Sequence, residues 1–186
     1  MNKKTVLIID DVKFNIKAVQ DMVGDSYTII GALSGEAGLK ILTHTIPDLI
    51  LLDIIMPEMD GHQVLETIKK TPAYKNIPVI FLTADSNSET EVMGFNEGVV
   101  DYITKPFVAD VLKKRIQTQI ELAEFRRSLE EQIALMSRII NIMSEKNLEG
   151  LNPEVADELL MISRLLKDAI DNKSDNSFIE RGKKNL

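Results

Sequence analysis

The sequence predicts an α/β fold, a parallel sheet covered by helices on both sides, followed by a helical extension. Two observations over about the first 120 residues predict the sheet. Short apolar runs alternate with stretches of helical period, and the runs are apolar on both faces, as in strands buried on both sides. A third observation predicts the extension, because neither Pro nor Gly stands between Phe107 and Lys146. At 186 residues, the chain has room for one domain and an appendage.

The first two strand–helix units occupy residues 5–42. We expect a strand at Thr5–Ile9, then a helix that Gly24 closes and whose apolar residues are spaced for one face, namely Val12, Ile16, Val19 and Val23. A second strand is expected at Tyr27–Ala32. Ser34 can cap the helix that follows, which carries Ala37, Leu39, Ile41 and Leu42.

Three further strands are expected at Leu49–Leu52, Val79–Leu82 and Asp101–Thr104. The turn-rich stretch Met56–Gly61 follows the first of these, and a helix carrying Val64, Leu65 and Ile68 then ends near Pro72. A fourth helix spans roughly Ser88–Asn96. The fifth begins after residue 107 and carries Val111, Leu112, Ile116 and Ile120.

Polar residues stand where four of the predicted strands end: Asp10 and Asp11, Asp53, Thr83 and Lys105. In an open parallel sheet these ends share one edge, where such folds bind ligands. Like charges 4 Å apart repel by about 4 kcal/mol at an effective dielectric of 20, so three carboxylates there need a cation. A site of few carboxylates suits Mg²⁺. Asp53 is the best candidate nucleophile, since a carboxylate can attack phosphorus, and Lys105 suits a bound phosphate.

These pieces, in this order, resemble the receiver domain of two-component response regulators, which accept a phosphoryl group on an aspartate from a histidine kinase. The matching segments are Asp10-Asp11, Asp53 with Met56-Pro57 and Asp60-Gly61, Thr83-Ala84, Tyr102 and Lys105-Pro106. The intervals of 30 residues from Asp53 to Thr83 and 22 from Thr83 to Lys105 also agree. The resemblance implies a flavodoxin-like, doubly wound sheet of five strands in the order 2-1-3-4-5.

The resemblance also implies a role for each matched residue. Asp53 would be the phosphoacceptor, and a histidine kinase or phosphotransfer protein the donor. The side chains of Asp11 and Asp53 and the backbone carbonyl of Ile55 would bind Mg²⁺, with Asp10 helping directly or through water. Thr83 and Lys105 would contact the phosphoryl group. Thr83 and Tyr102 would form a switch in which the aromatic ring turns inward, so the chain is predicted to be a signalling protein and not an enzyme.

Each of these residues also has a purely structural alternative. Asp10 or Asp11 alone suits a helix N-cap, Thr83 a strand-end hydroxyl bonded to backbone, and Tyr102 a packed aromatic. The other interpretations are a simple turn at Asp60-Gly61 and a surface position for His44 and His62.

Two positions bear on how long a phosphorylated state would last. Ile55, two residues after the phosphoacceptor, cannot orient a water molecule, whereas Asp85, two residues after Thr83, can. We therefore predict a phosphorylated state that lasts minutes or longer.

Beyond residue 121 the resemblance stops and a seven-residue repeat begins. Leu122, Leu129, Met136 and Met143 recur at one position, with Phe125, Gln132 and Ile139 at the complementary one, which indicates a coiled-coil seam with one polar interruption. Gly150 ends this pattern, and Asn152-Pro153 begins a second amphipathic helix with Val155, Leu159, Ile162, Leu166 and Ala169. The predicted divisions are a receiver domain at 1–121, a helical extension at 122–172 and a polar, disordered tail at 173–186.

An apolar stripe on a helix must be buried somewhere. Two chains packing as a homodimeric bundle would bury it, and the alternative is that the second helix folds back on the first. Residues 107–186 hold 13 Lys and Arg against 14 Asp and Glu, so no basic face for nucleic acid is indicated. The same segment has no histidine, which excludes a phosphohistidine relay there.

Composition limits the remaining classes. The net charge is −7, the chain has no cysteine, and no apolar run reaches the length of a membrane span, so we expect a cytoplasmic protein. Three rivals stay open: a receiver followed by a cyclic-nucleotide enzyme beyond residue 186, an RNA-binding output, and a flavodoxin-like cofactor carrier. The carrier would need a phosphate-binding loop where Asp10-Asp11 repels phosphate.

Overall fold

A computed structural model of the chain describes residues 3–84, 98–147, 155, 157–158, 161–162 and 165. The chain divides into two compact units, Met1–Glu124 and Phe125–Leu186, which are described separately. The helix predicted at Ser88–Asn96 lies outside the described residues, and so does Asp85.

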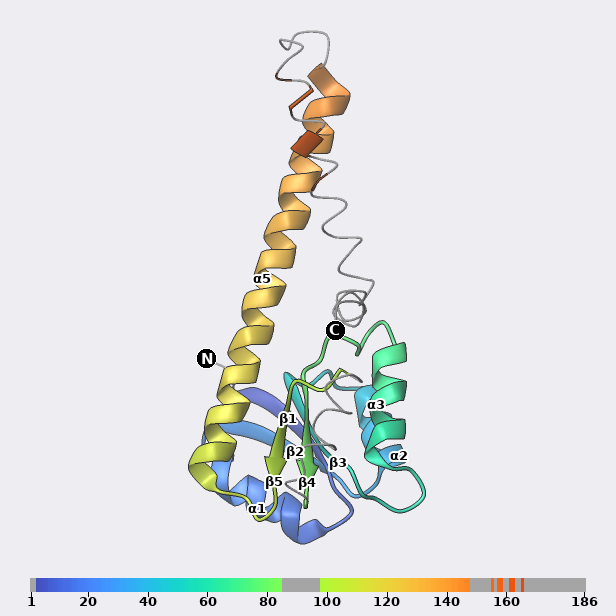
Figure 1. The fold of residues 1–186 in the computed structure, drawn as a ribbon, viewed down its shortest axis with the longest axis vertical. Helices are drawn as coiled ribbons and strands as arrows, with labels where there is room; N and C mark the ends of the chain where they lie inside the picture. Colours follow the sequence, from blue (N-terminus) through green and yellow to red (C-terminus); the bar gives the residue numbers. More distant parts are fainter. Residues whose placement is uncertain are drawn as a thin grey trace, which may run out of the picture. The chain divides into compact units, whose positions relative to one another are not determined.

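The first unit is built on a five-stranded parallel sheet in the order β2-β1-β3-β4-β5 (Figure 1). Its strands are β1 Lys4–Ile9, β2 Tyr27–Ala32, β3 Leu49–Asp53, β4 Val79–Thr83 and β5 Asp101–Thr104. The helices are α1 Lys13–Val23, α2 Gly35–Leu42, α3 Gly61–Lys70 and α5 Ala109–Asn147. The predicted fold class and strand order are confirmed. Asp53 and Thr83 are the last residues of their strands.

Successive side chains along each strand point to opposite faces of the sheet, so the core is divided into two clusters, one on each face. Leu7 and Ile9 of β1 pack with α2 and α3, whereas Val6 and Ile8 pack with α1 and the start of α5. Every residue of β3 is buried, because helices cover both of its faces. This is the packing expected of a parallel sheet, and it leaves the carboxyl ends of the strands as a place for polar side chains.

The start of α3 is more ordered than the simple turn that Asp60-Gly61 suggests. Asp60 is the N-cap: its side chain accepts a hydrogen bond from the Gln63 amide, and the Gln63 side chain accepts one from the Asp60 amide. This reciprocal pair is a capping box. Gly61 donates its amide to the carbonyl oxygen of Ile54 at 2.8 Å, which ties the helix to the chain just after β3. The expected cap of α2 is confirmed, since Ser34 accepts from the Ala37 amide.

The single long helix predicted after residue 107 is confirmed as α5 (Figure 1). Residues 109–124 of α5 belong to the first unit and residues 125–147 to the second. Of the predicted second helix, the described residues from Val155 to Leu165 are helical. Among the described residues, no helix combines the length and apolarity that crossing a membrane requires.

Candidate functional site

The polar strand ends meet at the carboxyl edge of the sheet, as predicted. Asp10 follows β1, Asp53 ends β3, Thr83 ends β4 and Lys105 follows β5. Within the described part of the chain, Asp10, Asp53 and Thr83 are the buried polar or charged side chains, at 0%, 6% and 6% exposure. Three buried polar side chains gathered at the carboxyl edge, where doubly wound sheets bind ligands, make this edge the candidate site.

Three carboxylates form the acidic part of this site. Asp10, Asp11 and Asp53 each offer an oxygen within 4.8 Å of the others. The Asp10 carboxylate is fixed on one side: its Oδ1 accepts from the Val12 amide and the Asn15 side-chain amide, both at 2.9 Å. The N-cap of α1 is Val12, with no side-chain cap bond, so the aspartates do not act as the helix cap. Asp11 is exposed.

Lys105 supplies the positive charge of the site. Its Nζ lies 2.6 Å from Asp53 Oδ2 and 2.8 Å from Asp10 Oδ2, and its side chain is 18% exposed. The Lys105 amide donates to the Thr83 carbonyl at 2.7 Å, and the Lys105–Pro106 peptide is cis. One ammonium group therefore joins residues from the ends of β1 and β3.

The single charge of Lys105 does not fully offset the burial of the Asp53 carboxylate. Burial raises the pKa of Asp53, and the hydrogen bond and charge of Lys105 offset this only in part. Burial lowers the pKa of Lys105, but its bonds to Asp10 and Asp53 outweigh burial and leave it above the ordinary value. Lys105 therefore holds its proton more firmly than a free lysine. Asp53 ionises less readily than a free aspartate, because burial and the nearby charge of Asp10 both raise its pKa.

The donor set fits a divalent cation. Carboxylate oxygens are the ligands that Mg²⁺ prefers, and the site holds three carboxylates against one lysine. Asp11 makes no hydrogen bond or ion pair with the described residues, which leaves its oxygens available to an ion. Ile55 lies beside the cluster, with its amide donating to Asp53 Oδ1 at 3.4 Å and its side chain 77% exposed.

The two predicted switch residues lie on the same side of this edge. Tyr102 of β5 is only 4% exposed, and its ring centroid lies 5.8 Å from that of Phe81, so the ring packs in the core. Phe81 in turn contacts His62 edge-on, at 5.2 Å between centroids. His62 is half-buried against Phe81, so the surface position expected for it holds only in part. His44 is exposed, as predicted.

The sequence did not reveal the roles of three residues around the site. Asn15 holds Asp10, Asp60 caps α3, and Asp101 accepts the Tyr102 amide at 2.8 Å while pairing with Arg115 of α5. Asn15 and Asp60 had local signals: Asn15 is a polar residue one helical turn after the acidic pair, and Gln63 follows Asp60 at the spacing of a capping box. The Asp101–Arg115 pair depends on how β5 and α5 meet.

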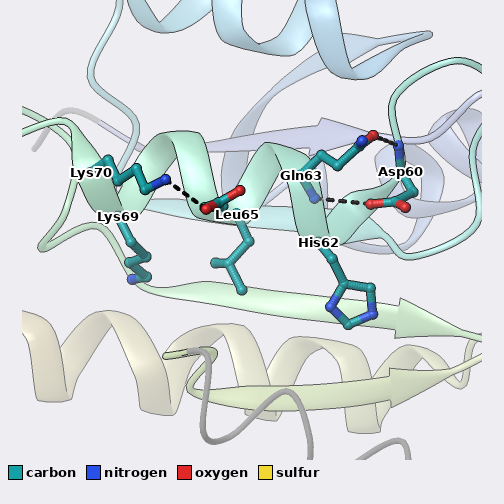
Figure 2. A pocket seen from close by; sticks show the side chains of 7 residues that line it. Asp60, His62, Gln63, Leu65, Lys69 and Lys70 are labelled. Carbon is teal, nitrogen blue, oxygen red and sulfur yellow. Dashed lines mark hydrogen bonds and ion pairs between the residues drawn. The ribbon is translucent and has the colours of Figure 1, made fainter.

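A separate cavity of about 520 Å³ lies along α3. Figure 2 shows its lining, in which the Asp60–Gln63 capping bonds and the Lys70–Glu66 ion pair run along the helix while His62, Leu65 and Lys69 project to one side. None of the strand-end residues is among those that line it, so the cavity and the acidic cluster are different features.

The strand order and the acidic edge with its lysine define a doubly wound α/β domain of the signal-receiving class. The chain belongs to the response regulator receiver domain family, whose family model matches residues 6–117. Receiver domains take a phosphoryl group from histidine kinases and bind Mg²⁺ through an acidic cluster of the kind found here.

Comparison with known proteins agrees with this assignment. The chain is 44% identical over 121 residues to a probable cyclic di-GMP phosphodiesterase of Vibrio cholerae, covering 65% of this chain and 27% of that protein. It is 30% identical over 127 residues to the response regulator PleD of Caulobacter vibrioides, covering 68% and 27%. A putative response regulator from Chloroflexus aurantiacus superposes with a TM-score of 0.62 at 28% identity, covering 64% of this chain and 99% of that one. The chain thus spans about a quarter of the length of the two curated relatives.

Proposed function

We propose that Asp53 accepts a phosphoryl group from a histidine kinase or phosphotransfer protein in a Mg²⁺-dependent reaction. The observation that carries this proposal is the Lys105 ammonium, bound to both Asp53 and Asp10 at the mouth of a three-carboxylate cluster. In a receiver fold, this arrangement puts a nucleophile, an acidic cation site and a fixed positive charge at one point.

Asp11 and Asp53, with the backbone carbonyl of Ile55, would hold the ion, and Asp10 would assist directly or through water. When bound, Mg²⁺ supplies positive charge to the oxygens of the transferring phosphoryl group. Asn15 fixes the Asp10 carboxylate in place, so this part of the site needs little rearrangement to receive the ion.

In the transfer, a carboxylate oxygen of Asp53 forms a bond to phosphorus while the bond from phosphorus to the donor's imidazole nitrogen breaks. The electron pair of that bond leaves with the imidazole. Lys105 is placed to follow the charge from the carboxylate to the new phosphoryl oxygens, because its Nζ already lies 2.6 Å from Asp53 Oδ2. Acyl phosphate formation on a carboxylate is nucleophilic catalysis without an external base.

Thr83 and Tyr102 would respond to phosphorylation of Asp53 by changing position. Phosphorylation adds roughly −1.5 to −2 charges and strong acceptors, which attract the Thr83 hydroxyl toward Asp53. Tyr102 follows on the neighbouring strand, where β4 and β5 pair Thr83 with Thr104 and Phe81 with Tyr102. Asp101 links the Tyr102 amide to Arg115, so a movement of β5 reaches α5 directly. The mechanism is a bias between two existing conformations.

The output would then pass to the helical extension. Residues 1–121 form the receiver in this proposal, and residues 122–172 supply helices that dimerise or bind a partner. A homodimer through α5 would cover the apolar stripe whose side chains are exposed in the single chain. The absence of a water-orienting side chain at Ile55 supports a phosphorylated state that lasts minutes or longer.

A second candidate is a receiver that controls an enzymatic output. The observation in its favour is length: a probable cyclic di-GMP phosphodiesterase matches this chain at 44% identity over only 27% of its own sequence. In that case the receiver would regulate cyclic-nucleotide chemistry carried by a further domain. A genomic reading frame that continues past Leu186 into such a domain would favour this candidate, and a stop codon would contradict it.

The central claim is tested with a small phosphodonor. Acetyl phosphate and Mg²⁺ should add one phosphoryl group to the full chain, seen by intact mass, and Asp53→Asn should gain none. Asp60→Asn is the matched control, because it is the same change at an exposed aspartate and asparagine also caps helices. Labelling of Asp53→Asn at the wild-type rate would contradict the proposal.

A further inference from the structure

Helix α5 carries an exposed apolar seam that the receiver site does not use. Leu122, Phe125, Leu129 and Met136 occupy the first and fourth positions of the seven-residue repeat, and they are 53%, 64%, 38% and 53% exposed. Large apolar side chains at consecutive core positions of one helix are the feature that drives coiled-coil pairing. The seam therefore requires an occupant.

We propose that the occupant is α5 of a second copy of this chain, aligned parallel and in register over residues 121–132. The inference deepens the homodimer of the proposed function and rests on it for its signalling role. It adds what that proposal leaves open, namely the direction of the partner helix, its register and the residues that set both.

The charged residues beside the seam favour the parallel direction. Glu121 directly precedes the seam residue Leu122, and Arg126 directly follows the seam residue Phe125. The two charged residues are five positions apart in the sequence, and both are exposed. In a parallel, in-register pair these two positions on opposite chains lie side by side, so Glu121 of each copy meets Arg126 of the other. Two reciprocal ion pairs result.

Within residues 121–140, an antiparallel pair cannot satisfy these charges. There, the positions before the seam meet one another, and in this segment they are Glu121, Ser128 and Leu135, none of which is positive. The positions after the seam are Arg126, Ile133 and Ile140, none of which is negative. Antiparallel pairing therefore places each charge beside a like, neutral or apolar residue.

Gln132 fixes the register. It is an exposed amide at a fourth position, where the neighbouring core residues are apolar. In a parallel, in-register pair it faces the same amide of the second copy, and each can donate to and accept from the other. In a parallel pair shifted by one repeat it would face Phe125, and in an antiparallel pair a first-position residue such as Leu129 or Met136, so either arrangement leaves a buried amide without a partner. A single polar core residue is a known means of specifying register.

The two-stranded segment ends at Gln132 because the flanking positions then become apolar. Ile133 and Leu135 widen the apolar face of α5, and Leu135 is 60% exposed. A face wider than a two-stranded seam contacts more than one neighbouring helix. The charged pair and the glutamine thus select the parallel alignment within residues 121–132.

Charge reversal tests the pairing in the full chain. Glu121→Lys and Arg126→Glu should each weaken self-association roughly tenfold in sedimentation equilibrium, since attraction becomes repulsion at two symmetric contacts. An equimolar mixture of the two variants should restore wild-type affinity, because each then offers the charge that the other needs. Arg127→Glu changes the neighbouring charge on the face of the helix away from the seam, so it should leave the self-association constant unchanged. Failure of the mixture to recover would overturn the proposal.

Disulfide cross-linking tests the relative direction of the two helices independently. Because the chain has no native cysteine, any cross-link must form at the introduced cysteine. Phe125→Cys should form a covalent dimer on oxidation with copper phenanthroline, because only parallel, in-register helices bring two copies of this position together. Leu129→Cys should do the same, and Arg127→Cys should not. Equal cross-linking of all three, or none at Phe125→Cys and Leu129→Cys, would overturn the proposal.

Both experiments are run with and without Mg²⁺ and beryllofluoride, which mimics an aspartyl phosphate, and phosphorylation of the same samples is followed by intact mass. A chain that cross-links as expected but takes no phosphoryl group contradicts the proposed function alone. A chain that is phosphorylated but self-associates in neither state contradicts the pairing alone.

Discussion

Lys105 places a single positive charge between two buried carboxylates, those of Asp53 and Asp10. The pKa of Asp53 is raised because burial outweighs the hydrogen bond and charge of Lys105, which Asp53 shares with Asp10. At the scale of one residue, this lysine therefore stabilises the fold as well as serving the proposed transfer. Its removal would leave negative charges that the site cannot solvate.

We predict that Lys105→Met lowers the free energy of unfolding by about 3 kcal/mol in the absence of divalent ions, the cost of breaking a buried ion pair. Mg²⁺ should restore part of the loss, because an ion that binds only the folded state stabilises it. Urea denaturation with and without Mg²⁺ measures both effects. The matched control is Lys70→Met, which breaks an exposed pair with Glu66 and should cost at most about 1 kcal/mol. Equal losses in the two variants would contradict this account.

At the scale of elements, the start of α3 is built against the end of β3. A Cβ added at Gly61 would lie 2.4 Å from the Asp53 carbonyl oxygen and 2.8 Å from the Ile54 Cα. Both neighbours are backbone atoms, so neither can rotate away. The glycine thus allows the helix to begin directly beside the residue proposed to accept the phosphoryl group.

Gly61→Ala should therefore destabilise the protein by about 1–3 kcal/mol and slow labelling of Asp53 by acetyl phosphate, since the contact displaces β3 or the helix start. Thermal unfolding and intact-mass time courses measure the two effects. Asp60→Asn, one residue away, keeps a capping side chain and should leave both close to wild type. A stable Gly61→Ala variant with normal labelling would show that the loop can relax.

The elements also show what a sequence can predict here. Apolar runs located β1, β3 and β4, because these interior strands are buried on both faces, and shorter apolar stretches located the edge strands β2 and β5. The polar residues that end β3 and β4 or follow β1 and β5 located the edge cluster. The capping role of Asp60 was missed although it is local, since Gln63 three residues later completes a capping box. The packing of His62 on Phe81 and the Asp101–Arg115 pair were missed because they depend on where α3 and α5 lie against the sheet.

At the scale of the molecule, the chain divides at Glu124 into two units. The first contains both core clusters, including Leu112, Ile116 and Ile120 of α5. It also keeps the ion pair between Lys4 and Glu124. The proposed receiver therefore has the contacts of an independently folding domain.

We predict that residues 1–124 alone unfold cooperatively and accept a phosphoryl group from acetyl phosphate as the full chain does, but sediment as a monomer. Circular dichroism, intact mass and sedimentation velocity give the three results. A fragment that is unfolded would show that the receiver needs the extension, and a fragment that dimerises would place the main interface on the receiver.

The position of β5 in the sheet has a consequence for how a signal can leave. β5 has one neighbouring strand, β4, and lies at the border of the sheet, whereas β3 is held on both sides. A displacement of β5 strains one ladder of hydrogen bonds, while a displacement of β3 would strain two. Lys105 and Tyr102 both belong to this border segment. The proposed phosphoacceptor thus lies on an interior strand, and the proposed movement is assigned to an edge strand, which has fewer hydrogen bonds to strain.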